Sequence, residues 1–217
     1  VARALVVTGF VARTRDGTPT TLKRNGSDYS ATIVGALLRA AGIVIWTDVD
    51  GVLSADPRRV PNAQVIDQLS YNEAMELAYF GAKVIHPQTM APAVAREIPI
   101  WIRNTFAPDK PGTVICARPT SALAVKGITS IEDVSLVNLE GAGMIGVPGT
   151  ASRLFGALRE EGISVVLISQ GSSEHSICCA VPREQADRAV ATVRAAFARE
   201  LGEGQIQSVE VDRELAI

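Results

Sequence analysis

The sequence lacks the features that mark several specialised classes of protein. Its 21 lysine and arginine residues nearly balance 23 aspartate and glutamate residues, so no charge surplus favours nucleic acid or an anionic membrane as a partner. It contains no apolar run of the ~20 residues that span a bilayer, and no signal-peptide pattern. The three cysteines, Cys116, Cys178 and Cys179, lack metal-ligand spacing and are an odd number for disulfides. We therefore expect a cytoplasmic protein with no protein-bound metal and no nucleic-acid or membrane partner.

An initiator methionine is also missing, and the chain opens at Val1 on an apolar stretch, Leu5–Val7, that predicts a strand. We expect a chain cut from a longer protein. The length of 217 residues fits one large domain or two small ones, at roughly 100–200 residues per domain. Hydrophobic residues make up 47% and charged residues 20%, a balance typical of folded chains.

The beginning of the chain combines loop, helix and strand signals. Residues 14–25 are polar and contain glycine and proline, which predicts an exposed loop or hairpin. A helix capped by Ser27 or Asp28 is expected to continue to Arg39. The continuous apolar run Ile43–Thr47 is typical of a buried parallel strand.

A second set of signals follows in the same half. Ser70 and Glu73 stand three apart, which predicts a capping box at the start of a helix that ends at Gly81. A further helix is expected over residues 87–97 and a strand over residues 98–102. Strands that alternate with helices predict an α/β sheet with helices on its faces.

The order of elements changes beyond residue 133. The pattern predicts strand, helix, strand, strand, helix and strand over residues 134–139, 150–161, 163–168, 176–181, 184–201 and 206–211. This βαββαβ order is ferredoxin-like. Two further strands, at residues 124–128 and 214–217, each need a partner sheet, which we expect in another small domain that the chain does not finish.

The first candidate for chemistry is the start of the helix after residue 25. A helix N-terminus with free N–H groups binds anions, and the Arg24 guanidinium is suited to a carboxylate or phosphate. Asp28 is suited to an amino group. The alternative is a plain turn with Arg24 in solvent.

The second candidate follows the apolar strand, at the strand end where ligands bind in open α/β sheets. Asp48 and Asp50 are suited to a ribose, a metal-bound phosphate or an ammonium group, and Arg58 to a phosphate. An Asp-Gly turn with solvated charges is the alternative.

The third candidate is Lys83, which lies between apolar residues after a helix end. A lysine held in place suits a polyphosphate, whereas a cation at a helix C-terminus can also simply complement the dipole. His86 and His175 are expected to be structural. The adjacent residues Cys178 and Cys179 are expected on a buried strand.

Together, these candidate segments resemble the aspartokinases of the amino acid kinase family. The matching stretches, in order, are Arg24–Ala31, Ile45–Val52, Ala55–Arg58 and Phe80–Pro87. The second half resembles an ACT domain, the regulatory βαββαβ unit that follows the kinase domain in this family. Its segments Gly141–Met144 and Ile168–Ser176 are most similar to the threonine-sensitive form, which is typically fused to homoserine dehydrogenase.

The resemblance implies an α/β fold: the C-terminal part of an amino acid kinase α/β sandwich followed by a ferredoxin-like ACT domain. The implied segments are residues 1–117 for the kinase part, 118–132 for a linker and the first strand of a split second ACT unit, 133–212 for the ACT domain and 213–217 for the next strand of that second unit.

The activity implied by the resemblance is ATP-dependent phosphorylation of the side-chain carboxylate of L-aspartate, the first step towards lysine, threonine and methionine. Arg24, Ser27 and Asp28 fall where the family holds aspartate, with Arg24 on a carboxylate and Asp28 on the amine. The implied ATP residues are Thr47, Asp48, Arg58, Lys83 and Val84. Mg²⁺ is expected on the phosphates, and catalysis rests on positioning and charge stabilisation.

Two departures from the family pattern matter. Leu53 stands where many members have a tyrosine near the nucleotide. The Lys-Phe-Gly-Gly-Thr-Ser type segment, whose lysine serves the phosphates, does not occur in this sequence. We therefore predict that the chain alone has no kinase activity, and an alternative function is an amino-acid-binding and dimerisation module.

The resemblance places regulatory residues at Met144, Ser164, Val165 and Gln170. Lysine-sensitive members have an acidic residue where this sequence has Val166, so a buried lysine ammonium would lack a partner. Gln170 can hydrogen-bond a hydroxy amino acid, or else be a satisfied strand-end amide. We expect threonine as the inhibitor in preference to lysine. ACT units commonly pair edge to edge, so a homo-oligomer through the strand at 176–181 is also expected.

Overall fold

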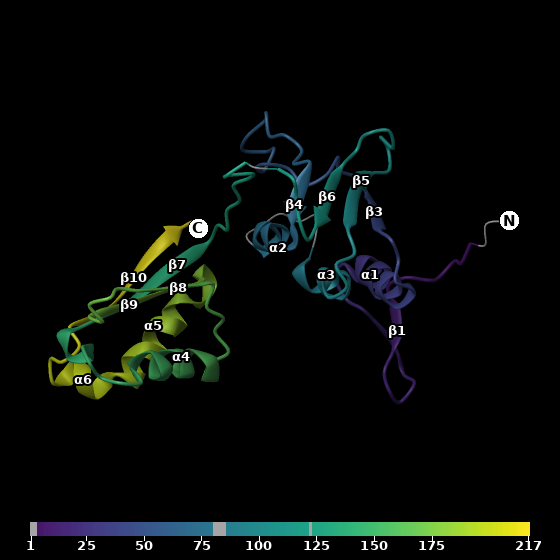
Figure 1. The fold of residues 1–217 in the computed structure, drawn as a ribbon. Helices are drawn as coiled ribbons and strands as arrows, with labels where there is room; N and C mark the ends of the chain where they lie inside the picture. The colour runs from purple at the N-terminus through teal and green to yellow at the C-terminus, as the bar shows by residue number, and fades with distance from the viewer. Residues whose placement is uncertain (1–3, 80–85, 122) are drawn as a thin grey trace. The chain divides into compact units, whose positions relative to one another are not determined.

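The computed structural model describes residues 4–79, 86–121 and 123–217. The chain divides into two compact units, Val1–Thr129 and Ser130–Ile217, which are described separately (Figure 1). Within the described residues, no helix is both long and apolar enough to cross a membrane.

The first unit contains a four-stranded sheet with strand order β3-β5-β6-β4. The strands are β3 (Ile43–Thr47), β4 (Gln68–Ser70), β5 (Ile100–Asn104) and β6 (Thr113–Cys116). The β3–β5 and β4–β6 pairs are parallel, and β5–β6 is antiparallel. The helices are α1 (Gly26–Leu38), α2 (Tyr71–Tyr79) and α3 (Pro87–Val94). All three gather on one side of the sheet (Figure 1).

Helices cover one face of this sheet rather than both. Ile43 and Ile45 of β3 are buried together with Ile100 and Ile102 of β5. On the opposite face of β3, Trp46 is 49% exposed and Val44 is 44% exposed. The expectation of helices on both faces is therefore wrong for the described residues, since β3 shows the period-two burial of a half-covered strand.

Local signals in the first unit are largely confirmed. The hairpin forms from β1 (Val11–Arg13) and β2 (Pro19–Thr21), which pair antiparallel. The capping box of α2 is present: the Ser70 backbone N–H donates to Glu73 Oε2 at 2.7 Å, and the Glu73 N–H donates to Ser70 Oγ at 3.2 Å. Gly81, the expected helix end, lies outside the described residues.

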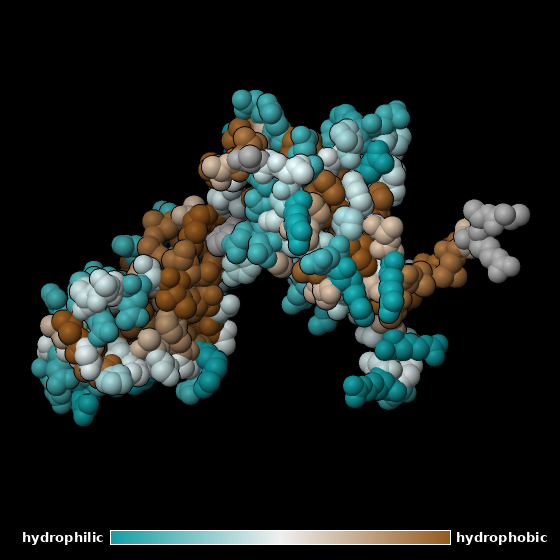
Figure 2. All heavy atoms as spheres, in the orientation of Figure 1, coloured by the Kyte–Doolittle hydropathy of each residue, from teal (hydrophilic) through white to brown (hydrophobic). Residues whose placement is uncertain are grey.

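Three expectations in the first unit are corrected. Helix α1 begins at Gly26 instead of being capped by Ser27 or Asp28, because Asn25 takes the left-handed conformation at the cap position. Leu5–Val7 forms no strand and pairs with none of the strands in the described residues, so its apolar side chains, brown in Figure 2, are exposed. Residues 124–128 form no strand either. The Ile128 N–H donates instead to the Ser54 carbonyl at 2.8 Å.

The second unit is an antiparallel sheet with order β10-β7-β9-β8, which confirms the predicted ferredoxin-like arrangement. Its strands are β7 (Val134–Glu140), β8 (Leu167–Gln170), β9 (Ser176–Pro182) and β10 (Ser208–Leu215). Its helices are α4 (Thr150–Glu160), α5 (Ala186–Ala196) and α6 (Ala198–Gly202), with 3-10 turns η1 (Ala142–Met144) and η2 (Arg183–Gln185). Its core gathers between the sheet and α4 and α5.

Three boundaries in the second unit differ from expectation. The strand expected over residues 163–168 is β8, which begins only at Leu167. The single helix expected over 184–201 is interrupted at Phe197, whose ring is buried beneath the Arg153 guanidinium at 3.9 Å. β10 continues to Leu215 rather than ending at residue 211, so the expected separate strand at 214–217 is not formed. Ile217 exchanges two backbone hydrogen bonds with Ile131, at 2.8 and 2.9 Å.

The place of β9 corrects the expected interface. β9 pairs with β7 on one side and β8 on the other, so it is a central strand with no free edge. The edges of this sheet are β8 and β10. Cys178 and Cys179 lie on β9 as predicted, and burial raises the pKa of the Cys179 thiol to about 11, which keeps it protonated and unreactive.

Candidate functional site

A cavity of about 250 Å³ opens where β3 ends and α1 begins. It is lined by Asn25 and Asp28 from the start of α1 and by residues 45–49 from β3 and the turn after it. Two of the three predicted segments therefore meet in space. They meet because the carboxyl end of a buried strand and the amino end of a helix lie at the same edge of the sheet.

The polar groups in this cavity are arranged in two short pairs. Asn25 Nδ2 donates to Asp28 Oδ2 at 3.2 Å, and Thr47 Oγ1 donates to Asp48 Oδ1 at 3.2 Å. Asp28 is half-buried and Asp48 is exposed. Arg24 and Ser27 are exposed and do not line the cavity, although they flank residues that do.

Arg58 lies on the loop after β3 and is paired locally. Its Nη2 donates to Asp56 Oδ2 at 2.6 Å, and its Nε donates to Asp56 Oδ1 at 3.1 Å. These hydrogen bonds lower the pKa of the Asp56 carboxyl to about 2. The Arg58 side chain is 77% exposed, so its guanidinium is oriented but remains accessible to a ligand. Lys83 and Val84 lie outside the described residues.

Asp50 does not line the cavity, and its carboxylate is hydrogen-bonded to other side chains of the protein. It accepts hydrogen bonds from Asn104 and Lys110. Sequence reasoning missed this arrangement, because Lys110 lies in a turn-rich stretch with no motif. The only sequence signal for a contact from Lys110 was its place among Pro, Asp and Gly residues, which indicates a turn.

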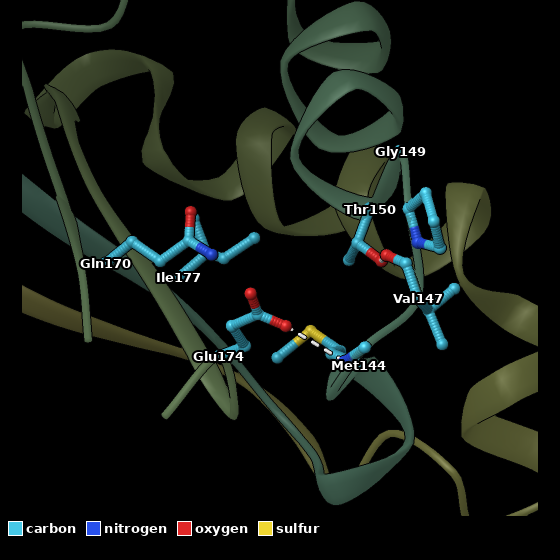
Figure 3. Close-up of a pocket in the computed structure, with 9 residues that line it drawn as sticks. Met144, Val147, Gly149, Thr150, Gln170, Glu174 and Ile177 are labelled. Atoms are coloured by element: carbon cyan, nitrogen blue, oxygen red, sulfur yellow. Dashed lines mark hydrogen bonds between the residues drawn. The ribbon is translucent and has the colours of Figure 1, made fainter. Parts of the chain in front are cut away.

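A second cavity, of about 320 Å³, lies in the second unit at the start of α4. Gln170 and Glu174 face Thr150 and Val147 across it, and Met144 forms its floor (Figure 3). The dashed line in Figure 3 marks the hydrogen bond at 2.9 Å from the Gly146 backbone N–H to Glu174 Oε2.

Two of the four predicted regulatory residues thus share one cavity, and two do not. Met144 and Gln170 line it. Val165 packs against the core of the second unit, and Ser164 is exposed. The reason is that β8 begins at Leu167, so the segment before it is an irregular approach to the strand rather than a strand beside the cavity.

The histidines have local roles. His86 Nδ1 accepts from the Gln88 backbone N–H at 3.3 Å and caps α3, which agrees with a structural residue. His175 Nδ1 lies 2.5 Å from Ser173 Oγ. In the part of the chain that the structure describes, no three His, Cys, Asp or Glu residues are grouped to hold a metal ion.

Comparison with known proteins identifies the class. Residues 2–104 match the amino acid kinase family, and residues 137–197 match an ACT domain. The chain therefore contains a segment of the amino acid kinase family, over residues 2–104, followed by an ACT domain.

The chain is similar to bifunctional aspartokinase/homoserine dehydrogenases. It is 49% identical over 216 residues to the chloroplastic bifunctional aspartokinase/homoserine dehydrogenase 2 of Arabidopsis thaliana. The match covers 97% of this chain and 24% of that protein. It is 47% identical over 216 residues to the Haemophilus influenzae protein, covering 99% of this chain and 26% of that protein. The chain thus spans about a quarter of the length of the curated relatives it matches.

Solved structures agree with the predicted fold class. Aspartate kinase of Clostridium acetobutylicum is similar with a TM-score of 0.81 and 28% identity, covering 96% of this chain and 48% of that chain. E. coli aspartokinase III, solved in complex with lysine and aspartate, is similar with a TM-score of 0.71 and 32% identity, covering 96% of this chain and 45% of that chain. Kinase-type and ACT-type folds in this order are thereby confirmed.

Proposed function

We propose that this chain belongs to a cytoplasmic aspartate kinase that transfers the γ-phosphoryl group of ATP to the side-chain carboxylate of L-aspartate, at the start of the route to lysine, threonine and methionine. The observation that carries the proposal is the cavity in which Asp28 meets Thr47 and Asp48. The relatives supply the reaction class, and the cavity joins the segments that resemble aspartate- and ATP-binding stretches.

The roles follow from charge and position. Asp28, a half-buried carboxylate in the first turn of α1, is suited to the ammonium group of aspartate. Arg24 and Ser27, exposed beside it, are suited to a substrate carboxylate. A carboxylate nucleophile needs no strong base, so these groups accelerate transfer by orienting the substrate.

Three of the predicted ATP residues, Thr47, Asp48 and Arg58, lie on β3 or on the segment that follows it. Thr47 and Asp48 line the cavity, and Arg58 presents an oriented guanidinium on the following loop. The described residues contain no cluster of three metal-ligating side chains, so Mg²⁺ would be held largely through the phosphates, as is common for this ion. When bound, the ion would neutralise phosphate charge.

The first test is kinase activity. The intact protein that contains this chain is expected to form an acyl phosphate from aspartate with ATP and Mg²⁺, trapped as the hydroxamate. The isolated chain is expected to be inactive, because the segment with the phosphate-binding lysine is absent from it. Normal turnover by the isolated chain would contradict this second expectation.

Asp28→Asn should raise the KM for aspartate about 30-fold in the intact protein, as expected for about 2 kcal/mol of a lost charge-assisted hydrogen bond.

We further propose that the second cavity binds threonine as a feedback inhibitor. Gln170 offers an amide to the hydroxyl group, Glu174 a carboxylate, and Thr150 a hydroxyl at the start of α4. Calorimetry on the chain should show threonine binding in preference to lysine. Gln170→Ala should weaken threonine binding about tenfold, the loss of one hydrogen bond to a ligand.

Ser164→Ala is the matched control for this titration, because Ser164 lies outside the cavity and is exposed. It is expected to leave threonine affinity unchanged. A response to lysine alone, or a loss of binding in Ser164→Ala with none in Gln170→Ala, would reject the assignment.

The alternative function, a regulatory and dimerisation module alone, is favoured if the intact protein binds threonine but phosphorylates nothing. Any oligomer formed by edge-to-edge pairing of this sheet would use β8 or β10.

A further inference from the structure

The loop between β5 and β6, residues 105–112, is held against the turn that follows β3. In that turn, Asp50 Oδ1 accepts from Asn104 Nδ2 at 2.6 Å, and Asp50 Oδ2 accepts from Lys110 Nζ at 2.6 Å. The hydrogen bond from Lys110, followed by that from Asn104, holds the pKa of the Asp50 carboxyl below its ordinary value. Both carboxylate oxygens of Asp50 therefore face the loop, in an ion pair that joins residues far apart in the sequence.

The contacts of Arg103 also hold the β5–β6 loop in place. Arg103 Nη2 donates to the carbonyl oxygens of Pro108 at 2.7 Å and Lys110 at 3.1 Å, so the guanidinium holds the loop in its folded form. The same guanidinium lies 5.2 Å from the centre of the Trp46 ring, and Trp46 lines the first cavity. The brace, as used below, consists of Asp50, Asn104 and Lys110, which join the turn to β5 and the loop, and Arg103, which holds the loop itself.

The backbone of the turn is anchored at both ends. At the near end, the Thr105 N–H donates to the Thr47 carbonyl at 2.8 Å. At the far end, the Val52 N–H donates to Thr113 Oγ1, a buried hydroxyl of β6, at 2.8 Å. Gly51 lies between them with φ +148°, and a Cβ there would lie 2.6 Å from Thr113 Oγ1. The segment that carries Asp48 is thus held between two fixed points.

We propose that Asp50 and Lys110 are positioning residues for the nucleotide. They keep the turn after β3 against the loop, so that Thr47 and Asp48 already have the arrangement that ATP meets. This inference rests on the proposed kinase function. It also predicts that loss of the brace affects ATP more than aspartate, because the brace joins the turn after β3 to β5 and the β5–β6 loop, whereas Asp28 lies on α1.

The test is a comparison of the two substrates in the intact protein. Lys110→Met and Asp50→Asn are expected to raise the KM for ATP about threefold to tenfold, the range for a partly exposed ion pair with an added hydrogen bond, and to leave the KM for aspartate within about twofold. Lys110→Arg should restore the KM for ATP. The two single substitutions should not be additive when combined. Arg159→Met is the control, since it removes a cation from an exposed ion pair in the second unit.

Each outcome decides the inference. An unchanged KM for ATP, or equal rises for both substrates together with a lower unfolding midpoint, would overturn the brace and leave the proposed function in place. If the wild type binds ATP but phosphorylates no aspartate, the proposed function fails, and calorimetric ATP affinities of the same variants still decide the brace. A wild type that binds no ATP overturns both.

Discussion

Replacing Gly112 by alanine is expected to destabilise the first unit by about 3 kcal/mol or more, among the larger effects of a single substitution. Gly112 has φ +74°, a conformation that alanine adopts only with strain. A Cβ at this position would collide with the carbonyl oxygen of Ile102, and Ile102 is fully buried in β5. Because the backbone fixes the position of the Cβ and its partner is a backbone oxygen, no flexible side chain can move aside, so β5 and β6 must separate locally.

Gly17→Ala is the matched control for this substitution. Gly17 has φ +87°, but no atom lies within 4 Å of the position its Cβ would take. It therefore isolates conformational strain, and we expect a cost of about 1 kcal/mol. Both tryptophans, Trp46 and Trp101, lie in the first unit, so urea unfolding followed by tryptophan fluorescence reports on this unit. Equal losses in the two variants would refute the collision with Ile102.

The ion pair between Glu73 and Lys126 is expected to respond asymmetrically to loss of its two members. Lys126 Nζ lies 2.8 Å from Glu73 Oε2, and the side chains are 6% and 40% exposed, respectively. Glu73→Gln leaves a buried ammonium without its anion, so we expect a loss of about 2–3 kcal/mol, reduced from the fully buried case because Glu73 reaches water. Lys126→Met removes the buried charge and leaves Glu73 to be hydrated, at a cost below about 1 kcal/mol.

The double variant should recover much of the loss in Glu73→Gln, because no unpaired charge then remains. Urea unfolding of the four proteins forms a complete cycle. If Lys126→Met is as damaging as Glu73→Gln, the loss belongs to packing of the lysine stem rather than to its charge.

The same pair predicts a dependence of stability on pH. The hydrogen bond from Lys126, and then that from the Ser70 N–H, lowers the pKa of Glu73 from 4.5 in the folded protein. The unfolded chain therefore binds this proton more readily, so the stabilisation is complete above pH 4.5 and is lost as pH falls through the folded pKa. The loss should be shallower in Lys126→Met. Parallel acid profiles in the two proteins would remove the pair as the cause.

Short-range signals were sufficient for many elements. Ser70 and Glu73 predicted the start of α2 because a capping box involves only four neighbouring residues. The order βαββαβ followed from periodicity, and the sheet of the second unit has that arrangement. The meeting of Asp28 with Thr47 and Asp48 was accessible as well, because sheet topology brings strand ends and helix starts to one edge.

Pairings over long separations were not accessible in this way. β4 and β6 have three and four residues and carry no distinctive pattern; β4 is held by pairing with β6, and β6 by pairing with both β4 and β5. The segment 124–128 has the composition of a strand but packs without one. Apolarity made β9 a candidate edge, yet the pairing of both its sides made it central, since local composition does not determine which neighbours a strand acquires.

The sequence by itself determined the fold class, the start of α2, the βαββαβ unit and some of the residues that line the two cavities, because these depend on patterns within a few residues of each other. Only the tertiary structure decided that Asp50 is bound by Lys110, that Lys126 is buried against Glu73 and that Ser164 does not line the cavity to which Gln170 belongs. The two ion pairs join residues 60 and 53 positions apart, and their energy depends on burial and distance, which exist only once the chain has folded.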